Sequence, residues 1–80
     1  MAKRPTIHEK LSHELVEWLI KDFSTRLKTE GIGKEDLLVK VGEEIGVSAR
    51  HLRNWLARGH YPTGLYTKAV EKYRTVREAA

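Results

Sequence analysis

The chain has 80 residues and a formal net charge of +4, and its 40% hydrophobic and 32% charged residues are typical of a folded domain. It lacks cysteine, which excludes disulfides, thiolate metal sites and cysteine nucleophiles. Apolar runs fall short of the roughly 18 residues of a membrane span, and no apolar stretch follows the basic start as in a secretory signal. We therefore expect a soluble, cytoplasmic protein with a single domain over residues 1–80.

The first predicted element is a long helix over about residues 6–30. Thr6 and Glu9 have the spacing of a capping box, and Gly31 is a natural C-cap. The polar face is narrow, so the apolar residues span roughly 220° of the helical wheel. Because one chain's core would hardly cover both apolar edges, we predict a homodimer; a bundle that wraps the helix within one chain is the alternative. The predicted dimer interface is formed by Ile7, Leu11, Leu15 and Trp18.

Three shorter helices are predicted to follow. The second begins near Lys34, has acidic residues in its first turn, and stops at Gly46; the third begins at Ser48, a good N-cap, and reaches residue 57 or 58. After the loop GHYPTG a fourth helix closes the fold over about residues 64–78. The second helix is expected to turn Leu37, Leu38, Val41 and Ile45 inward. The apolar members of the fourth are Leu65, Tyr66, Ala69, Val70, Tyr73 and Val76. The predicted fold class is all-α, a four-helix bundle with a central helix-turn-helix over about 34–58.

Charge is distributed unevenly along the chain. Residues 6–44 hold nine acids and six bases, whereas residues 45–80 hold two acids and seven bases, with no acid between Glu44 and Glu71. Such asymmetry concentrates positive potential on one part of the surface, as nucleic-acid binding requires. A basic face that is merely solvated is the alternative.

The second and third predicted helices have the spacing of a helix-turn-helix. Gly42 is small where the two helices approach closely, and Gly46 lies at the turn, where a positive φ costs glycine little. Leu52 and Trp55 are expected to face inward. The outer face of the third helix then carries guanidinium, amide and small side chains. Arginine can bind guanine through two acceptors, asparagine can pair with adenine, and small residues let a helix enter the major groove.

The segment LVKVGEEIGVSARHLRNWLARG resembles the helix-turn-helix of the lambda-repressor/Cro-like family of DNA-binding regulators. The residues that match in register are Gly42, Gly46, Val47, Ser48, Leu52 and Trp55. Gly42 stands where that family usually has alanine, a difference expected to be sterically harmless but to weaken the helix. The long first helix departs from the family's short one, so the dimer geometry is not carried over. The resemblance implies base reading by Ser48, Ala49, Arg50, Arg53 and Asn54.

These features predict a repressor-like regulator of transcription, of phage, plasmid or bacterial type, that binds double-stranded DNA as a homodimer and inserts residues 48–57 into the major groove. Contacts to the DNA backbone are expected from Arg58, His60, Tyr61, Thr63 and Lys68. Two alternatives stay open: a DNA-binding accessory factor in recombination, packaging or conjugation, and a protein-interaction module built on the first helix. We expect no enzymatic activity, cofactor or small-molecule effector. A metal site is not expected either, because His8 and His13 lie five residues apart, on different faces of the helix.

Overall fold

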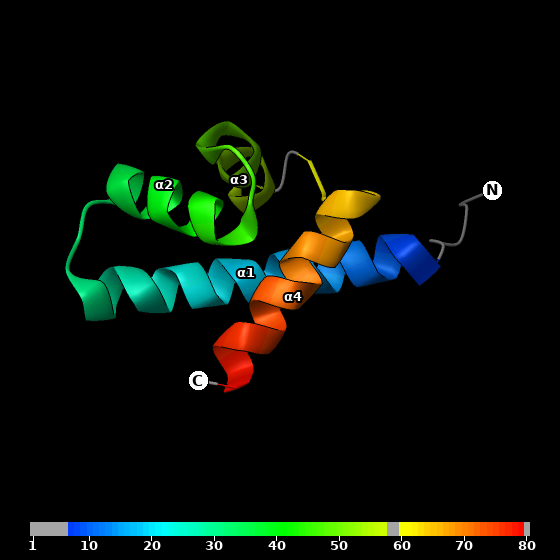
Figure 1. Ribbon diagram of the computed structural model, residues 1–80, viewed down its shortest axis with the longest axis horizontal. Helices are drawn as coiled ribbons and strands as arrows, with labels where there is room; N and C mark the ends of the chain where they lie inside the picture. Colours follow the sequence, from blue (N-terminus) through cyan, green and yellow to red (C-terminus); the bar gives the residue numbers. More distant parts are fainter. Residues whose placement is uncertain (1–6, 58–59, 80) are drawn as a thin grey trace.

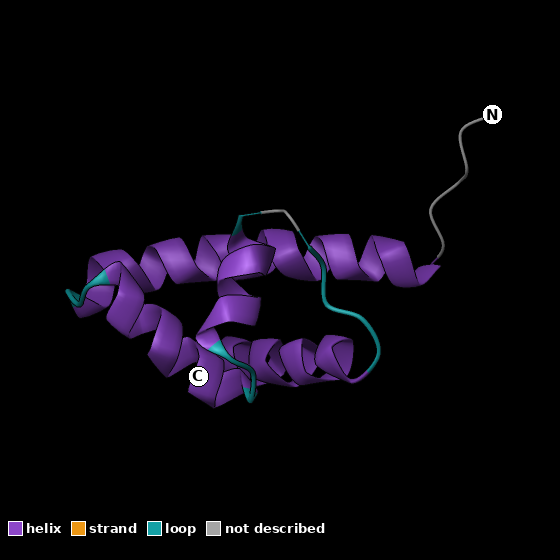
Figure 2. Cartoon of the chain, turned by 90° about the horizontal axis from the view of Figure 1, so that it is seen from above, coloured by secondary structure: helices purple, strands orange, loops and turns teal. Residues whose placement is uncertain are grey.

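The computed structural model describes residues 7–57 and 60–79, with side chains from His13 onward. Over these residues it confirms the all-α prediction, with four helices: α1 (Ile7–Glu30), α2 (Lys34–Ile45), α3 (Ala49–Leu56) and α4 (Leu65–Ala79). In Figure 1, α1 runs along the longest axis of the molecule, α2 and α3 lie above it, and α4 crosses in front of it. Seen from above in Figure 2, α1 and α4 lie on opposite sides and α3 crosses between them.

The core forms where the apolar side of α1 meets the other three helices. The inward faces predicted for α2 and α3 are confirmed, because their aliphatic residues and Trp55 are buried together. Burial of these side chains is the main stabilising contribution to a domain of this size. The core consists of Leu15, Val16, Leu19, Phe23, Leu37, Leu38, Val41, Ile45, Leu52, Trp55, Val70 and Tyr73.

The described part of the expected dimer edge of α1 is largely covered within the single chain. Leu15 is only 1% exposed, so its predicted place at a dimer interface was wrong. Trp18 is half-buried: its ring packs edge-on against Tyr73, with 5.8 Å between ring centroids, and the guanidinium of Arg74 lies over it at 5.7 Å. The reason is that α4 crosses α1 on this side, which periodicity along α1 does not reveal. The other two predicted interface residues, at positions 7 and 11, precede the first residue whose side chain the structure describes.

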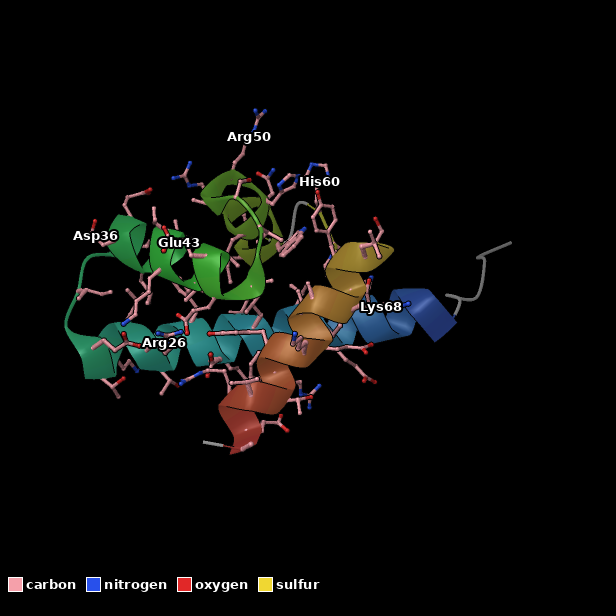
Figure 3. The ribbon with its side chains drawn as sticks, viewed as in Figure 1. Arg26, Asp36, Glu43, Arg50, His60 and Lys68 are labelled. Carbon is pink, nitrogen blue, oxygen red and sulfur yellow. The ribbon has the colours of Figure 1, made fainter. Side chains whose placement is uncertain are left out.

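A buried arginine joins α1, α2 and α4. Arg26 is 5% exposed, and its Nη1 donates to the carboxylate of Glu44 at 3.0 Å and to the hydroxyl of Tyr73 at 2.9 Å. Its Nε pairs with Glu30 one turn along α1. Figure 3 shows Arg26 on α1 at the side that faces α2. These hydrogen bonds raise the pKa of Arg26 and, chiefly through Arg26, lower the pKa of Glu30 to about 2.

The same network continues to the C-terminal part of α4. Tyr73 donates its hydroxyl to Asp22 at 3.1 Å, and Arg77 donates to both oxygens of that carboxylate, each at 3.1 Å. Burial raises the pKa of Tyr73 to about 12. A buried charge is tolerated only when it is paired and hydrogen-bonded, and here every member has a partner. The network therefore fixes how α4 crosses α1.

Candidate nucleic-acid interface

The angle between α2 and α3 is set by a left-handed glycine. Gly46 has φ 94° and ψ 31°, and its N–H donates to the carbonyl of Gly42 at 2.7 Å. The N–H of Val47 donates to the same carbonyl at 2.8 Å. Both bonds satisfy a backbone carbonyl at the end of α2. They require a left-handed conformation at Gly46, which is costly for residues with a Cβ. The predicted role of Gly46 at the turn is confirmed.

Gly42 allows the close approach that this turn requires. A Cβ placed on Gly42 would lie 2.8 Å from the carbonyl oxygen of Val47, and the next nearest atom is the backbone nitrogen of Ala49 at 3.6 Å. The predicted need for a small residue is confirmed. Even an alanine would not fit here without a shift, because the obstructing atom belongs to backbone rather than to a flexible side chain.

The start of α3 is capped and connected to α4. The hydroxyl of Ser48 accepts from the backbone N–H of His51 at 3.2 Å and lies 2.9 Å from its Nδ1. The His51 ring is 5.2 Å from the ring of Tyr66 on α4, and Tyr66 packs edge-on against Trp55 at 5.9 Å. This aromatic cluster holds the N-terminal end of α3 in place, while Ser48 itself stays exposed.

Arg50 is the cation that α3 presents most freely. It is exposed and forms no ion pair with the described part of the chain, and Figure 3 shows it pointing away from the body of the molecule. Arg53 is also exposed, but its Nη2 lies 2.5 Å from a carboxylate oxygen of Glu35 in the first turn of α2. The stretch that lacks acids in the sequence therefore has an acid beside it in space. An ion pair this exposed is worth at most about 1 kcal/mol, so Arg53 can be released at small cost.

The other predicted contact residues differ in how available they are. Ala49 and Asn54 are half-buried at the edges of α3, and His60 and Thr63 are exposed in the loop that leads to α4. Tyr61 stacks on His13 of α1, with 4.1 Å between ring centroids and 9° between planes. One face of its ring is therefore covered by α1. Arg58 lies outside the described residues.

The structure brings some of these residues together and separates one. In Figure 3, Arg50 and His60 lie at the same edge of the molecule, whereas Lys68 lies on α4, well away from them. The surface presented to a ligand thus consists of the outer face of α3 and the loop of residues 60–63. Lys68 lies outside this surface in Figure 3, and its contact with the DNA backbone stays a prediction.

This surface joins an exposed guanidinium, a second one held by a weak ion pair, and an exposed capped helix start, which suits contact with bases and phosphates. No protein-family model matches the chain, and no curated protein or solved structure matches it. None of the described helices is long and apolar enough to cross a membrane. Within the same part of the chain, no three His, Cys, Asp or Glu side chains are grouped to hold a metal ion.

Proposed function

We propose that this protein binds double-stranded DNA sequence-specifically, by inserting α3 into the major groove, and acts as a repressor-like regulator of transcription. The observation that carries the proposal is Arg50, which projects from the outer face of the second helix of a helix-turn-helix with no ion-pair partner in the described chain. An unpaired arginine at this position is free to bind the two acceptors of guanine.

The charge distribution supports the same proposal. The part of the chain after Glu44 carries seven bases and two acids, and α3 itself contains no acid. A helix fits the width of the major groove, and positive charge near it lowers the energy of approach to the phosphates. In this arrangement Arg50 and Asn54 read bases, and Arg53 joins them once it leaves Glu35. In this proposal the exposed side chains of Ser48, His60 and Thr63 contact the DNA backbone.

Binding to duplex DNA of random sequence, measured by fluorescence anisotropy at several salt concentrations, tests the proposal. We expect an affinity that falls steeply with salt, since each phosphate contact contributes about −0.9 to the logarithmic slope. Arg50→Ala should weaken binding to a selected site by about 1–3 kcal/mol, and Arg50→Lys should keep binding to random DNA while losing discrimination. Lys28→Ala removes an exposed charge of the same sign from α1 and should have little effect.

Two results would contradict the proposal. Binding that does not depend on salt, or no binding at all, would favour the protein-interaction module built on α1. Equal losses for Arg50→Ala and Lys28→Ala would show that α3 is not the surface that contacts DNA.

A further inference from the structure

The large hydrophobic side chains that stay exposed fall mainly on two helix faces. Within the described residues these side chains are Val39, Leu65, Tyr66 and Val76. Tyr66 is in contact with the rings of His51 and Trp55. The other three belong to surfaces of opposite charge, one on α2 and one on α4.

The acidic face of α2 consists of Asp36, Val39 and Glu43, which are three and four residues apart and therefore lie side by side on the helix. All three are exposed, Val39 by 50%, and neither acid has an ion-pair partner within the described chain. Lys40, at the border of this face, is turned toward α1, where its Nζ lies 2.7 Å from Glu30. Figure 3 shows Asp36 and Glu43 on α2. The face is thus negative with an apolar centre.

The basic face of α4 consists of Leu65, Lys68, Lys72 and Val76, spaced by three, four and four residues along one side of the helix. Leu65 is 81% exposed and Val76 is 62% exposed, although both are among the apolar residues that recur along this helix. Neither lysine is paired with an acid in the described part of the chain. This face is positive and flanked by apolar side chains at both ends.

We propose that copies of this protein associate head to tail, with the basic face of α4 in one copy against the acidic face of α2 in the next. The two faces are complementary in charge, and each carries apolar side chains that the contact would remove from water. DNA would match the lysines but not Leu65 and Val76. Figure 3 also places Lys68 away from Arg50, so this contact leaves the outer face of α3 free.

Such a contact is heterologous, because it joins two different surfaces, and a heterologous contact can repeat from copy to copy. In Figure 3, Asp36 lies toward one end of the longest axis and Lys68 toward the other, so one copy has room for a neighbour at each face. Exposed ion pairs and a few apolar side chains make each contact weak and sensitive to salt. Neighbouring copies on DNA would strengthen it through their high effective concentration.

Sedimentation velocity without DNA tests the inference independently of the proposed function. At low salt, the sedimentation coefficient of the unmodified protein should rise with protein concentration up to about 1 mM, a range suited to a small interface, and the rise should shrink in high salt. Asp36→Lys with Glu43→Lys, and separately Lys68→Glu with Lys72→Glu, should each abolish the rise. A mixture of these two double variants should associate again, because the faces that meet are once more opposite in charge.

A chain that carries all four substitutions provides the matched control for folding and for net charge. Its two faces have exchanged their charges, so it should associate with itself as the unmodified protein does. If the unmodified protein stays monomeric over this range, or if the mixture and the fourfold variant both stay monomeric while circular dichroism shows them folded, the inference is wrong. Association that survives in either double variant alone would also overturn it.

Discussion

Replacing Gly42 by alanine is predicted to destabilise the protein, against the usual preference of helices for alanine. A helix interior gains about 1 kcal/mol when alanine replaces glycine. Here the added Cβ would lie 2.8 Å from the carbonyl oxygen of Val47, and relieving such overpacking typically costs about 1–3 kcal/mol. The oxygen belongs to the turn that Gly46 holds, so it yields little and the cost lies in the upper part of this range, about 2–3 kcal/mol. We expect a net loss of about 1–2 kcal/mol in the free energy of unfolding.

Urea denaturation followed by circular dichroism measures this loss, and the thermal midpoint should fall by roughly 4–16 °C for a domain of this size. Gly33→Ala is the matched control. Gly33 has φ −65°, which alanine adopts freely, and its added Cβ would meet only Asp36 Oδ2, at 3.8 Å. The control should change stability by less than about 1 kcal/mol. If Gly42→Ala is as stable as the unmodified protein, the helices can separate without cost and the close approach is not what requires glycine.

Two further predictions follow from the ion pairs. Glu35→Gln should release Arg53, which on random duplex DNA meets phosphates in place of a matching base. It should strengthen binding to random duplex DNA by up to roughly fivefold and steepen the salt slope of that binding by about 1. Glu43→Gln makes the same charge change elsewhere on α2, and equal effects of the two substitutions would show that Glu35 does not specifically restrain Arg53. Because Arg26 lowers the pKa of Glu30 from its usual 4.5 to about 2, this pair's stabilisation is complete above pH 4.5 and is lost as the pH falls toward 2. Thermal unfolding between pH 6 and 2 should therefore depend less on pH in Glu30→Gln, and an unchanged dependence would show that the pair contributes nothing.

Local signals in the sequence were sufficient to predict the four helices and the turn between α2 and α3. Gly31 and Gly46 end their helices with positive φ, and Ser48 caps α3, as their residue types predict. The periodicity of Leu52 and Trp55 was enough to identify the buried side of α3. These features depend on residues within a few positions of one another, which is why a single sequence is sufficient to predict them.

Features that depend on how helices cross were not predictable in the same way. Arg26 is buried because its partners Glu44 and Tyr73 come from α2 and α4, and nothing near Arg26 in the sequence indicates that pairing. Leu65 and Val76 fit the apolar period of α4 but face outward, because the helix packs through Val70 and Tyr73 instead. The covering of Leu15 and the pairing of charges across α2 and α3 have the same origin.

Selection of bound sequences from a pool of random duplex DNA tests the central proposal most directly. If α3 reads bases through Arg50, the unmodified protein should enrich a defined sequence that contains a guanine, and Arg50→Ala should lose the preference at that guanine while other positions keep theirs. Enrichment of the same sequence by both proteins would contradict the role of Arg50. A pool that stays random after selection with the unmodified protein would contradict sequence-specific binding itself.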